Sequence, residues 1–250
     1  LLISPNFALL KKNDIMGRIF EKRKHKMFAR FDRMAKTFTR IGKDIAIAVK
    51  QGGPLPENNP KLRMAIQNAK GANMPKERVD AAIKRASSKD EKDLQEVTYE
   101  GYAPHGVPIM VECATDNPTR TVANIRLHFS KNGGSMGNSG SVAFMFERRG
   151  VFKFDPTKIN LDELELDLID AGAEDIERAE EETIIYTKFA DFGSMAKFLE
   201  SKHLEAKSSE LQYIPTTTKE LSEEEQDEVL KCVEALEADD DVQNVYHNLA

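Results

Sequence analysis

The hydrophobic pattern of the first third of the chain predicts helices. Between residues 27 and 50, apolar residues recur at three- and four-residue spacing, with no proline and one glycine, as in an amphipathic helix. Its apolar side is formed by Phe31, Met34, Ala35, Phe38, Ile41, Ile45 and Val49. Two more helices are predicted over 61–70 and 75–86, since Pro, Gly and Asn residues mark their ends. Three helices with short connections predict a small bundle.

The pattern changes near residue 97, where alternating apolar and polar residues are typical of β-strands. Strands are predicted over 97–102, 107–115 and 141–146, with a helix over 118–131 between the second and the third. An acidic helix over 222–236 and a final strand over 242–246 end the chain. The strands predicted between residues 97 and 146 need one more helix and one more strand to form a closed two-layer unit. The C-terminal segment supplies both.

Residues 148–215 show a second repeating order. Strand, helix, strand, strand, helix and strand follow one another, which is the split βαββαβ order of ferredoxin-like units. The predicted fold class is therefore α+β with three domains: an N-terminal helical bundle, a discontinuous α/β middle domain and an inserted ferredoxin-like domain. The expected boundaries are 16–90 for the bundle, 94–147 plus 216–250 for the middle domain and 148–215 for the insertion. Residues 1–15 are expected to be a non-native or disordered extension.

Charge divides the chain into two unequal parts. Residues 1–96 contain 22 Lys and Arg against 11 Asp and Glu, whereas residues 97–250 contain 14 against 31. Such asymmetry indicates a basic part that faces a polyanion and an acidic remainder. The side of the first helix opposite its apolar stripe is almost purely cationic. A solvated helix face usually mixes the two signs, because oppositely charged pairs stabilise it. We therefore predict that this face binds nucleic acid.

The residues expected to contact nucleic acid lie in the basic cluster of residues 22–26, on the first predicted helix and on the third. They are Arg23, Lys24, Lys26, Arg30, Arg33, Lys36, Arg40, Lys43, Lys84 and Arg85. Their role is expected to be contact with phosphates, which positions a protein without reading base sequence.

No catalytic constellation is visible in the sequence. The two cysteines, Cys113 and Cys232, lie far apart, and the five histidines show no metal-ligand spacing. Cys113 falls in the middle of a predicted strand, where packing in the core is expected. We therefore predict a protein that is not an enzyme and has no cofactor and no metal site. No apolar run approaches the roughly 20 residues that span a bilayer, so no membrane contact is expected, and a reducing, cytoplasmic location fits.

A glycine- and serine-rich loop spans residues 133–141. Phosphate-binding glycine loops follow a strand and precede a helix. Here the order is helix, loop, strand, and no Lys-Ser or Lys-Thr follows. A plain connector is the preferred interpretation, ahead of a loop that touches a phosphate.

The ordered motifs resemble one protein family, the YebC/PmpR type, over essentially everything from Met16 on. The motifs are Gln51-Gly52-Gly53, Asn59-Pro60-Lys61-Leu62-Arg63, Asn73-Met74-Pro75-Lys76-Glu77, Ala82-Ile83-Lys84-Arg85, Tyr99-Glu100-Gly101-Tyr102-Ala103-Pro104, Thr115-Asp116-Asn117 and Phe129-Ser130-Lys131-Asn132-Gly133-Gly134. The chain departs from the family at Gly17-Arg18-Ile19-Phe20-Glu21, where the family commonly has Gly-His-Ser-Lys-Trp. The resemblance therefore carries over no role that rests on that Trp, since this chain has no Trp.

The resemblance implies a helical N-terminal domain and two α/β domains, one inserted in the other. Family members are described as DNA-binding transcriptional regulators. They are also linked to the ribosome, where they aid translation of difficult stretches such as consecutive prolines, and mitochondrial members activate translation of cytochrome c oxidase subunit I.

Three functional hypotheses remain at the level of sequence. The first is a DNA-binding transcriptional regulator with a basic N-terminal helical domain on the phosphate backbone. The second is a ribosome-associated translation factor that binds rRNA and relieves stalling. The third is a protein-interaction scaffold that binds no nucleic acid. A monomer is expected, and the residues do not decide between DNA and RNA.

Overall fold

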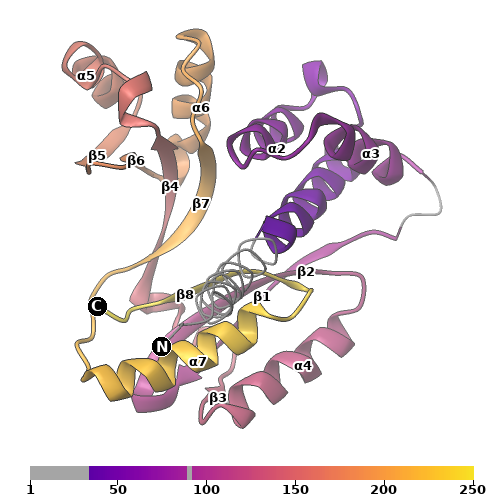
Figure 1. The fold of residues 1–250 in the computed structure, drawn as a ribbon, viewed down its shortest axis with the longest axis vertical. Helices are drawn as coiled ribbons and strands as arrows, with labels where there is room; N and C mark the ends of the chain where they lie inside the picture. Colours follow the sequence, from indigo (N-terminus) through magenta and orange to yellow (C-terminus); the bar gives the residue numbers. More distant parts are fainter. Residues whose placement is uncertain (1–33, 89–91) are drawn as a thin grey trace, which may run out of the picture. The chain divides into compact units, whose positions relative to one another are not determined.

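The computed structural model describes residues 34–88 and 92–250, which form a mixed α+β structure (Figure 1). The chain divides into two units, residues 1–39 and 40–250. The predicted extension over residues 1–15 lies outside the described residues, and so does the basic cluster.

Three helices form the predicted bundle. Residues 34–52 are helical, and α2 (Pro60–Gly71) and α3 (Lys76–Ala86) follow after the short 3-10 turn η1 (Pro56–Asn58). Ile45, Leu62 and Ala69 have no exposed surface, and Val79 of α3 packs into the same core. The predicted apolar side of the first helix is buried at Phe38, Ile41, Ile45 and Val49, whereas Met34 and Ala35 are exposed.

Asn59 joins the first helix to the second. Its side-chain oxygen accepts a hydrogen bond from the backbone N–H of Leu62 at 3.0 Å, which caps α2 as predicted. Its amide nitrogen donates to the carbonyl oxygens of Ala48 at 2.7 Å and Gly53 at 2.9 Å, at the end of the first helix. Because helix ends leave backbone groups without partners, one buried side chain satisfies both ends of this connection.

The first sheet has the strand order β3-β1-β2-β8, all antiparallel. Its strands are β1 (Gln95–Ala103), β2 (Val107–Thr115), β3 (Ser135–Met136) and β8 (Val242–His247). Helices α4 (Pro118–Lys131) and α7 (Glu223–Glu237) pack against it around a core that includes Ile109, Phe129 and Leu236. The C-terminal segment supplies α7 and β8 to this sheet, as expected from the sequence.

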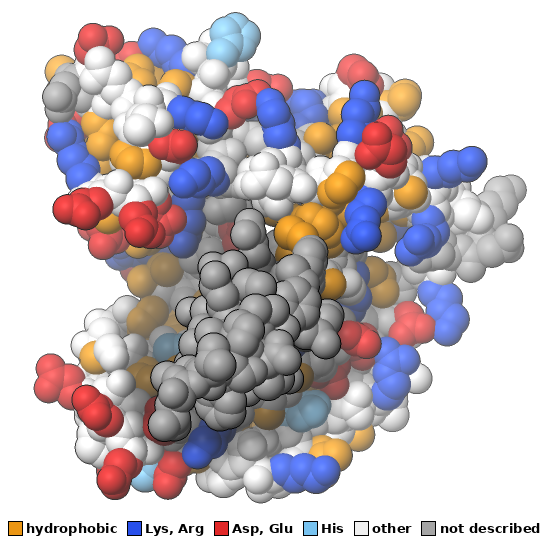
Figure 2. Space-filling model, viewed as in Figure 1, with side chains coloured by type: hydrophobic (Ala, Val, Ile, Leu, Met, Phe, Trp, Pro, Cys, Tyr) orange, Lys and Arg blue, Asp and Glu red, His pale blue; other side chains and the backbone are white. Residues whose placement is uncertain are grey.

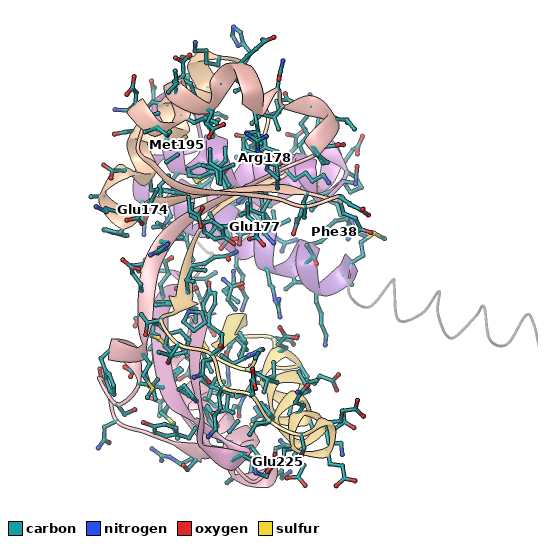
Figure 3. All side chains as sticks on the ribbon, turned by 90° about the vertical axis from the view of Figure 1, so that its left-hand side faces the viewer. Phe38, Glu174, Glu177, Arg178, Met195 and Glu225 are labelled. Atoms are coloured by element: carbon teal, nitrogen blue, oxygen red, sulfur yellow. The ribbon has the colours of Figure 1, made fainter. Side chains whose placement is uncertain are left out.

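The second sheet has the order β5-β6-β4-β7 and is also antiparallel. It contains β4 (Phe146–Phe154), β5 (Ala173–Arg178), β6 (Thr183–Lys188) and β7 (Ser208–Pro215), with helices α5 (Leu161–Asp170) and α6 (Phe192–Ser201). Met195, labelled in Figure 3, is fully buried in the core between sheet and helices. The predicted βαββαβ fold is confirmed, while the exact domain boundaries stay predictions.

The predicted strand over 141–146 is wrong. Ser141 lies in an irregular segment, and residues Ala143–Met145 form a 3-10 turn, η3, directly before β4. The physical reason is that the backbone N–H groups of Val142 and Ala143 donate to the Glu100 carboxylate, at 2.8 and 2.9 Å, and not to a neighbouring strand. Strand β4 instead begins at Phe146, the last residue of the predicted strand, and runs to Phe154.

Helix α2 covers the free edge of β7. The Asn68 side chain accepts from the Ser209 backbone N–H at 2.8 Å and donates to the Ser209 carbonyl oxygen at 3.1 Å, as a neighbouring strand would. A Cβ added to Gly71 would lie 1.8 Å from the Lys207 carbonyl oxygen, so only glycine permits this approach. Unpaired strand edges are prone to association, and here a helix satisfies part of the edge.

A buried carboxylate ties the first helix to the first sheet. Asp241, 8% exposed, accepts from the Thr121 hydroxyl at 2.8 Å and from Arg120 Nη2 at 2.7 Å. Lys43 Nζ lies 3.6 Å from Asp241 Oδ1 and donates to the carbonyl oxygens of Ala114, at 2.7 Å, and of Asp240. Burial tends to raise the pKa of Asp241, but the hydrogen bonds from Arg120 and Thr121 and the Lys43 charge outweigh it and hold the pKa below its usual value.

Replacing Asn59 by alanine should destabilise the bundle. The substitution removes an N-cap worth about 1 kcal/mol and leaves two carbonyls in a buried site without their donor, which costs about 1–3 kcal/mol. We expect the free energy of unfolding in urea to fall by about 2–4 kcal/mol. The exposed neighbour variant Asn58→Ala is the control and should change it little. An equal decrease in the free energy of unfolding in the two variants would contradict the role given to Asn59.

Replacing Asp241 by asparagine should weaken the protein in a pH-dependent way. At pH 7 we expect a loss of about 2–3 kcal/mol, because Lys43 loses its anionic partner and Arg120 loses one of its two. The folded-state pKa of Asp241 is lowered, so its stabilisation is complete above the unfolded value of about 3.9 and is lost as pH falls through the folded pKa. Urea unfolding should therefore show the two proteins converging below about pH 4. The exposed Asp240→Asn variant should show no such convergence.

Candidate nucleic-acid interface

The ten predicted contact residues fall in three different situations. Arg23, Lys24, Lys26, Arg30 and Arg33 lie outside the described residues. Lys36 is exposed and belongs to residues 34–39 of the first unit. The other four lie on the helical bundle of residues 40–250, so only these can be compared with one another in the structure.

Lys43 and Arg40 are engaged within the fold. Lys43 Nζ binds two carbonyl oxygens and faces Asp241, with 17% of its side chain exposed. Arg40 is half-buried, and its carbonyl oxygen accepts from the Gln243 side chain at 3.1 Å. A phosphate would have to displace the partners of Lys43, which makes this lysine the least available of the predicted contacts within residues 40–250.

The cations of α2 pair with carboxylates from other parts of the chain. Lys61 lies 3.4 Å from Glu96, Arg63 lies 3.1 Å from Glu200, and Lys70 donates to Glu205 at 2.7 Å. Arg63 also donates to the carbonyl oxygen of Pro56 at 2.8 Å. Exposed pairs of this kind contribute about 0–1 kcal/mol each. They nevertheless neutralise α2, so this helix does not present an open cationic surface.

Helix α3 is different, because its last two cations project into solvent. Lys84 and Arg85, both predicted contacts, are exposed and form no ion pair with any residue that the structure describes. Arg78 is also exposed and lies seven residues before Arg85, which places the two on the same side of the helix two turns apart. Arg78 was missing from the predicted contacts, although this seven-residue spacing could have identified it.

Small residues separate the cations of α3. Ala81 and Ala82 lie between Arg78 and Arg85, so no bulky side chain stands between the two guanidinium groups along the helix. The space-filling view shows Lys and Arg side chains on the part of the surface that carries this helix (Figure 2). We take the exposed side of α3, with Arg78, Lys84 and Arg85, as the candidate interface within residues 40–250.

The glycine-rich loop is occupied by a side chain of the protein itself. Glu100, 7% exposed, accepts from the backbone N–H groups of Gly140 at 2.7 Å, Val142 and Ala143. Burial tends to raise the pKa of Glu100, but these three donors outweigh it and hold the pKa below its usual value. An ionised carboxylate therefore uses the N–H groups that a phosphate would need, which supports the connector interpretation of residues 133–141.

Neither cysteine has the properties of a nucleophile. Cys113 and Cys232 are free and buried in the core of the first sheet, as expected for Cys113. Burial raises the pKa of Cys113 to about 12 and that of Cys232 to about 11, so both stay thiols at neutral pH. In residues 34–88 and 92–250, no group of three His, Cys, Asp or Glu residues is placed to hold a metal ion. No helix in that part of the chain has the length and apolar character needed to cross a membrane.

Comparison with known proteins gives consistent matches. Residues 18–89 match the family description "TACO1/YebC protein N-terminal domain", and residues 94–249 match "TACO1/YebC second and third domain". A "Probable transcriptional regulatory protein" of Anaeromyxobacter dehalogenans is 58% identical over 240 residues, 94% of this chain and 100% of that protein. One of the same description from Myxococcus xanthus is 55% identical over 240 residues, again 94% of this chain and 100% of that protein.

A solved structure shares the fold as well. It is described as the crystal structure of a conserved hypothetical protein, Aq1575, from Aquifex aeolicus. The match has a TM-score of 0.76 and 39% sequence identity, and covers 86% of this chain and 90% of that one. With family matches over both the helical and the sheet-containing parts, and relatives more than half identical over nearly its whole length, this chain belongs to the TACO1/YebC family.

Proposed function

We propose that this protein is a DNA-binding transcriptional regulator that holds the phosphate backbone with the basic helical part of the chain. The observation that carries the proposal is the solvent-facing side of α3, where Lys84 and Arg85 have no carboxylate partner among the described residues. Unpaired cations on one face favour a polyanionic ligand. The printed descriptions of the bacterial relatives, probable transcriptional regulatory proteins, agree with this proposal.

The contacts proposed here position the protein on the nucleic acid and do not read its sequence. Arg78, Lys84 and Arg85 lie on a helix whose other exposed positions include Glu77 and Asp80. Acidic side chains next to the cations oppose deep entry of this helix into a groove. Binding should therefore depend strongly on salt and weakly on sequence, because phosphate contacts dominate affinity and carry no sequence information.

A ribosome-associated translation factor that binds rRNA is the second candidate. The specific observation in its favour is the separation of charge, with an acidic remainder that includes α7, which has seven acidic residues and one lysine. A ribosome offers both rRNA for the cations and basic proteins for the acidic helices. Phosphate contacts serve DNA and RNA alike, so α3 is compatible with either.

The double variant Lys84→Ala, Arg85→Ala should bind nucleic acid less tightly and with a shallower salt dependence. Each lost phosphate contact reduces the slope of log K against log salt by about 0.9 for duplex DNA, so two should reduce it by about 1.8. Fluorescence anisotropy with a labelled DNA duplex and a labelled rRNA fragment measures both quantities. The control Lys197→Ala, Lys231→Ala removes two exposed lysines from α6 and α7. An unchanged slope in the α3 variant would refute its role.

Crosslinking in intact cells, followed by sequencing of the bound nucleic acid, should separate the two candidates. For the transcriptional regulator we expect promoter DNA to be enriched over rRNA. Recovery of rRNA from one discrete region would instead establish the translation factor. Recovery of neither above a non-crosslinked sample would remove both candidates and favour a protein-interaction scaffold.

A further inference from the structure

Helix α4 stands out from the acidic part of the chain. Its 14 residues, Pro118–Lys131, contain Arg120, Arg126 and Lys131 and no Asp or Glu. Residues 97–250 as a whole contain 14 Lys and Arg against 31 Asp and Glu, so three cations without an acid on one helix are unexpected there. Helix α7, which packs against the same sheet core, has the opposite composition, with seven acidic residues and one lysine.

Structural roles account for only part of this charge. Arg120 is held by Asp116 at 3.1 Å and by Asp241 at 2.7 Å, so it belongs to the network around the buried carboxylate. Lys131 lies in the last turn, where a cation complements the helix dipole. Arg126 has neither explanation. Both Arg126 and Lys131 are exposed, and neither forms an ion pair within the part of the chain that the structure describes.

The buried side of α4 fixes which way these cations point. Thr121, Ile125 and Phe129 are buried against the sheet. Arg126, Leu127, Ser130 and Lys131 are all exposed, with Leu127 48% exposed between the two cations. The outer face of α4 is thus cationic with an apolar centre, and no acidic side chain from the helix itself competes for a bound anion.

Strands β1 and β2 separate α4 from α3 along the chain, and α4 lies at the lower right and centre of the view in Figure 1. In the space-filling view, Lys and Arg side chains recur along the right-hand side with some Asp and Glu among them, and further Asp and Glu side chains lie at the lower left and the upper left (Figure 2). Glu225, labelled in Figure 3, marks the acidic N-terminal turn of α7. A polyanion would therefore meet the outer face of α4 favourably and the acidic helix α7 unfavourably.

We propose that the outer face of α4, centred on Arg126 and Lys131, is a second phosphate-contacting surface for the nucleic acid that α3 binds. This inference rests on the proposed function, because it assigns a second contact for the same ligand. The ligand class is a nucleic acid longer than the stretch that α3 alone covers. Its backbone, shared by DNA and RNA, supplies the phosphates for the two cations.

The test is the double variant Arg126→Ala, Lys131→Ala in the full chain. Its binding to a labelled DNA duplex and to a labelled rRNA fragment is measured by anisotropy over a salt series. We expect the slope of log K against log salt on the duplex to fall by about 1.8, as for two lost contacts. The charge-preserving variant Arg126→Lys, Lys131→Arg should retain the wild-type slope, since a purely electrostatic contact tolerates this exchange. The arm with the larger change identifies DNA or RNA as the ligand that reaches α4.

The matched control is again Lys197→Ala, Lys231→Ala, which changes the net charge by the same amount. If the slope of log K against log salt falls equally in this control and in the α4 variant, the inference is overturned, because the change in net charge alone would then explain the effect. An α4 variant with wild-type binding, beside an α3 variant that binds weakly, would overturn the inference and leave the proposed function standing. A wild-type protein that binds neither probe at low salt would overturn the proposed function, and the second contact with it.

Discussion

The structure depends on a single buried carboxylate, that of Asp241. It accepts hydrogen bonds from Arg120 and Thr121 of α4 and faces Lys43 of the first helix. Through these partners it holds together three segments that are distant in the sequence: the first helix, α4 and the start of β8. A charge in a buried site is stable only when its partners satisfy it. The packing of the helical bundle on the first sheet therefore depends on groups contributed by all three segments.

The same principle explains how cations are used across the molecule. Lys61, Arg63 and Lys70 of α2 pair with carboxylates from outside the bundle, and Lys43 faces Asp241. These four basic residues are engaged within the fold. Arg85 and Lys84 of α3 are left facing solvent. The excess of positive charge in the first part of the chain thus serves two purposes, internal attachment on some helices and an open surface on another.

The fold could be predicted well because its core follows simple periodic patterns. The bundle helices, the βαββαβ order and the return of the C-terminal helix and strand to the first sheet were all visible in the alternation of apolar and polar residues. The stretch around residues 141–150 was predicted wrongly, since its conformation depends on Glu100, forty residues away in the sequence. Periodicity reports local preference, and no local signal shows that a distant carboxylate will bind these backbone N–H groups.

The candidate site was predictable in its chemistry and less so in its details. Composition indicated a polyanion, and Lys84 and Arg85 lie on an exposed surface as expected. The sequence could not show that the amine of Lys43 would bind carbonyl oxygens at the end of β2 and before β8, because that partnership exists only after the sheet has formed. Sequence position alone does not separate a cation that attaches one part of the fold to another from a cation that remains available.

The contact between Asn68 and the edge of β7 has a consequence for the behaviour of incomplete chains. Strand β7 ends its sheet, and the side chain of Asn68 occupies the backbone groups of Ser209 that another strand would otherwise pair with. A proteolytic fragment that begins after α2 would keep the second sheet and lose this cover. Such a fragment would carry an open strand edge, through which copies could associate edge to edge by backbone hydrogen bonds. The helical part that we propose for nucleic-acid binding also acts as a safeguard against aggregation.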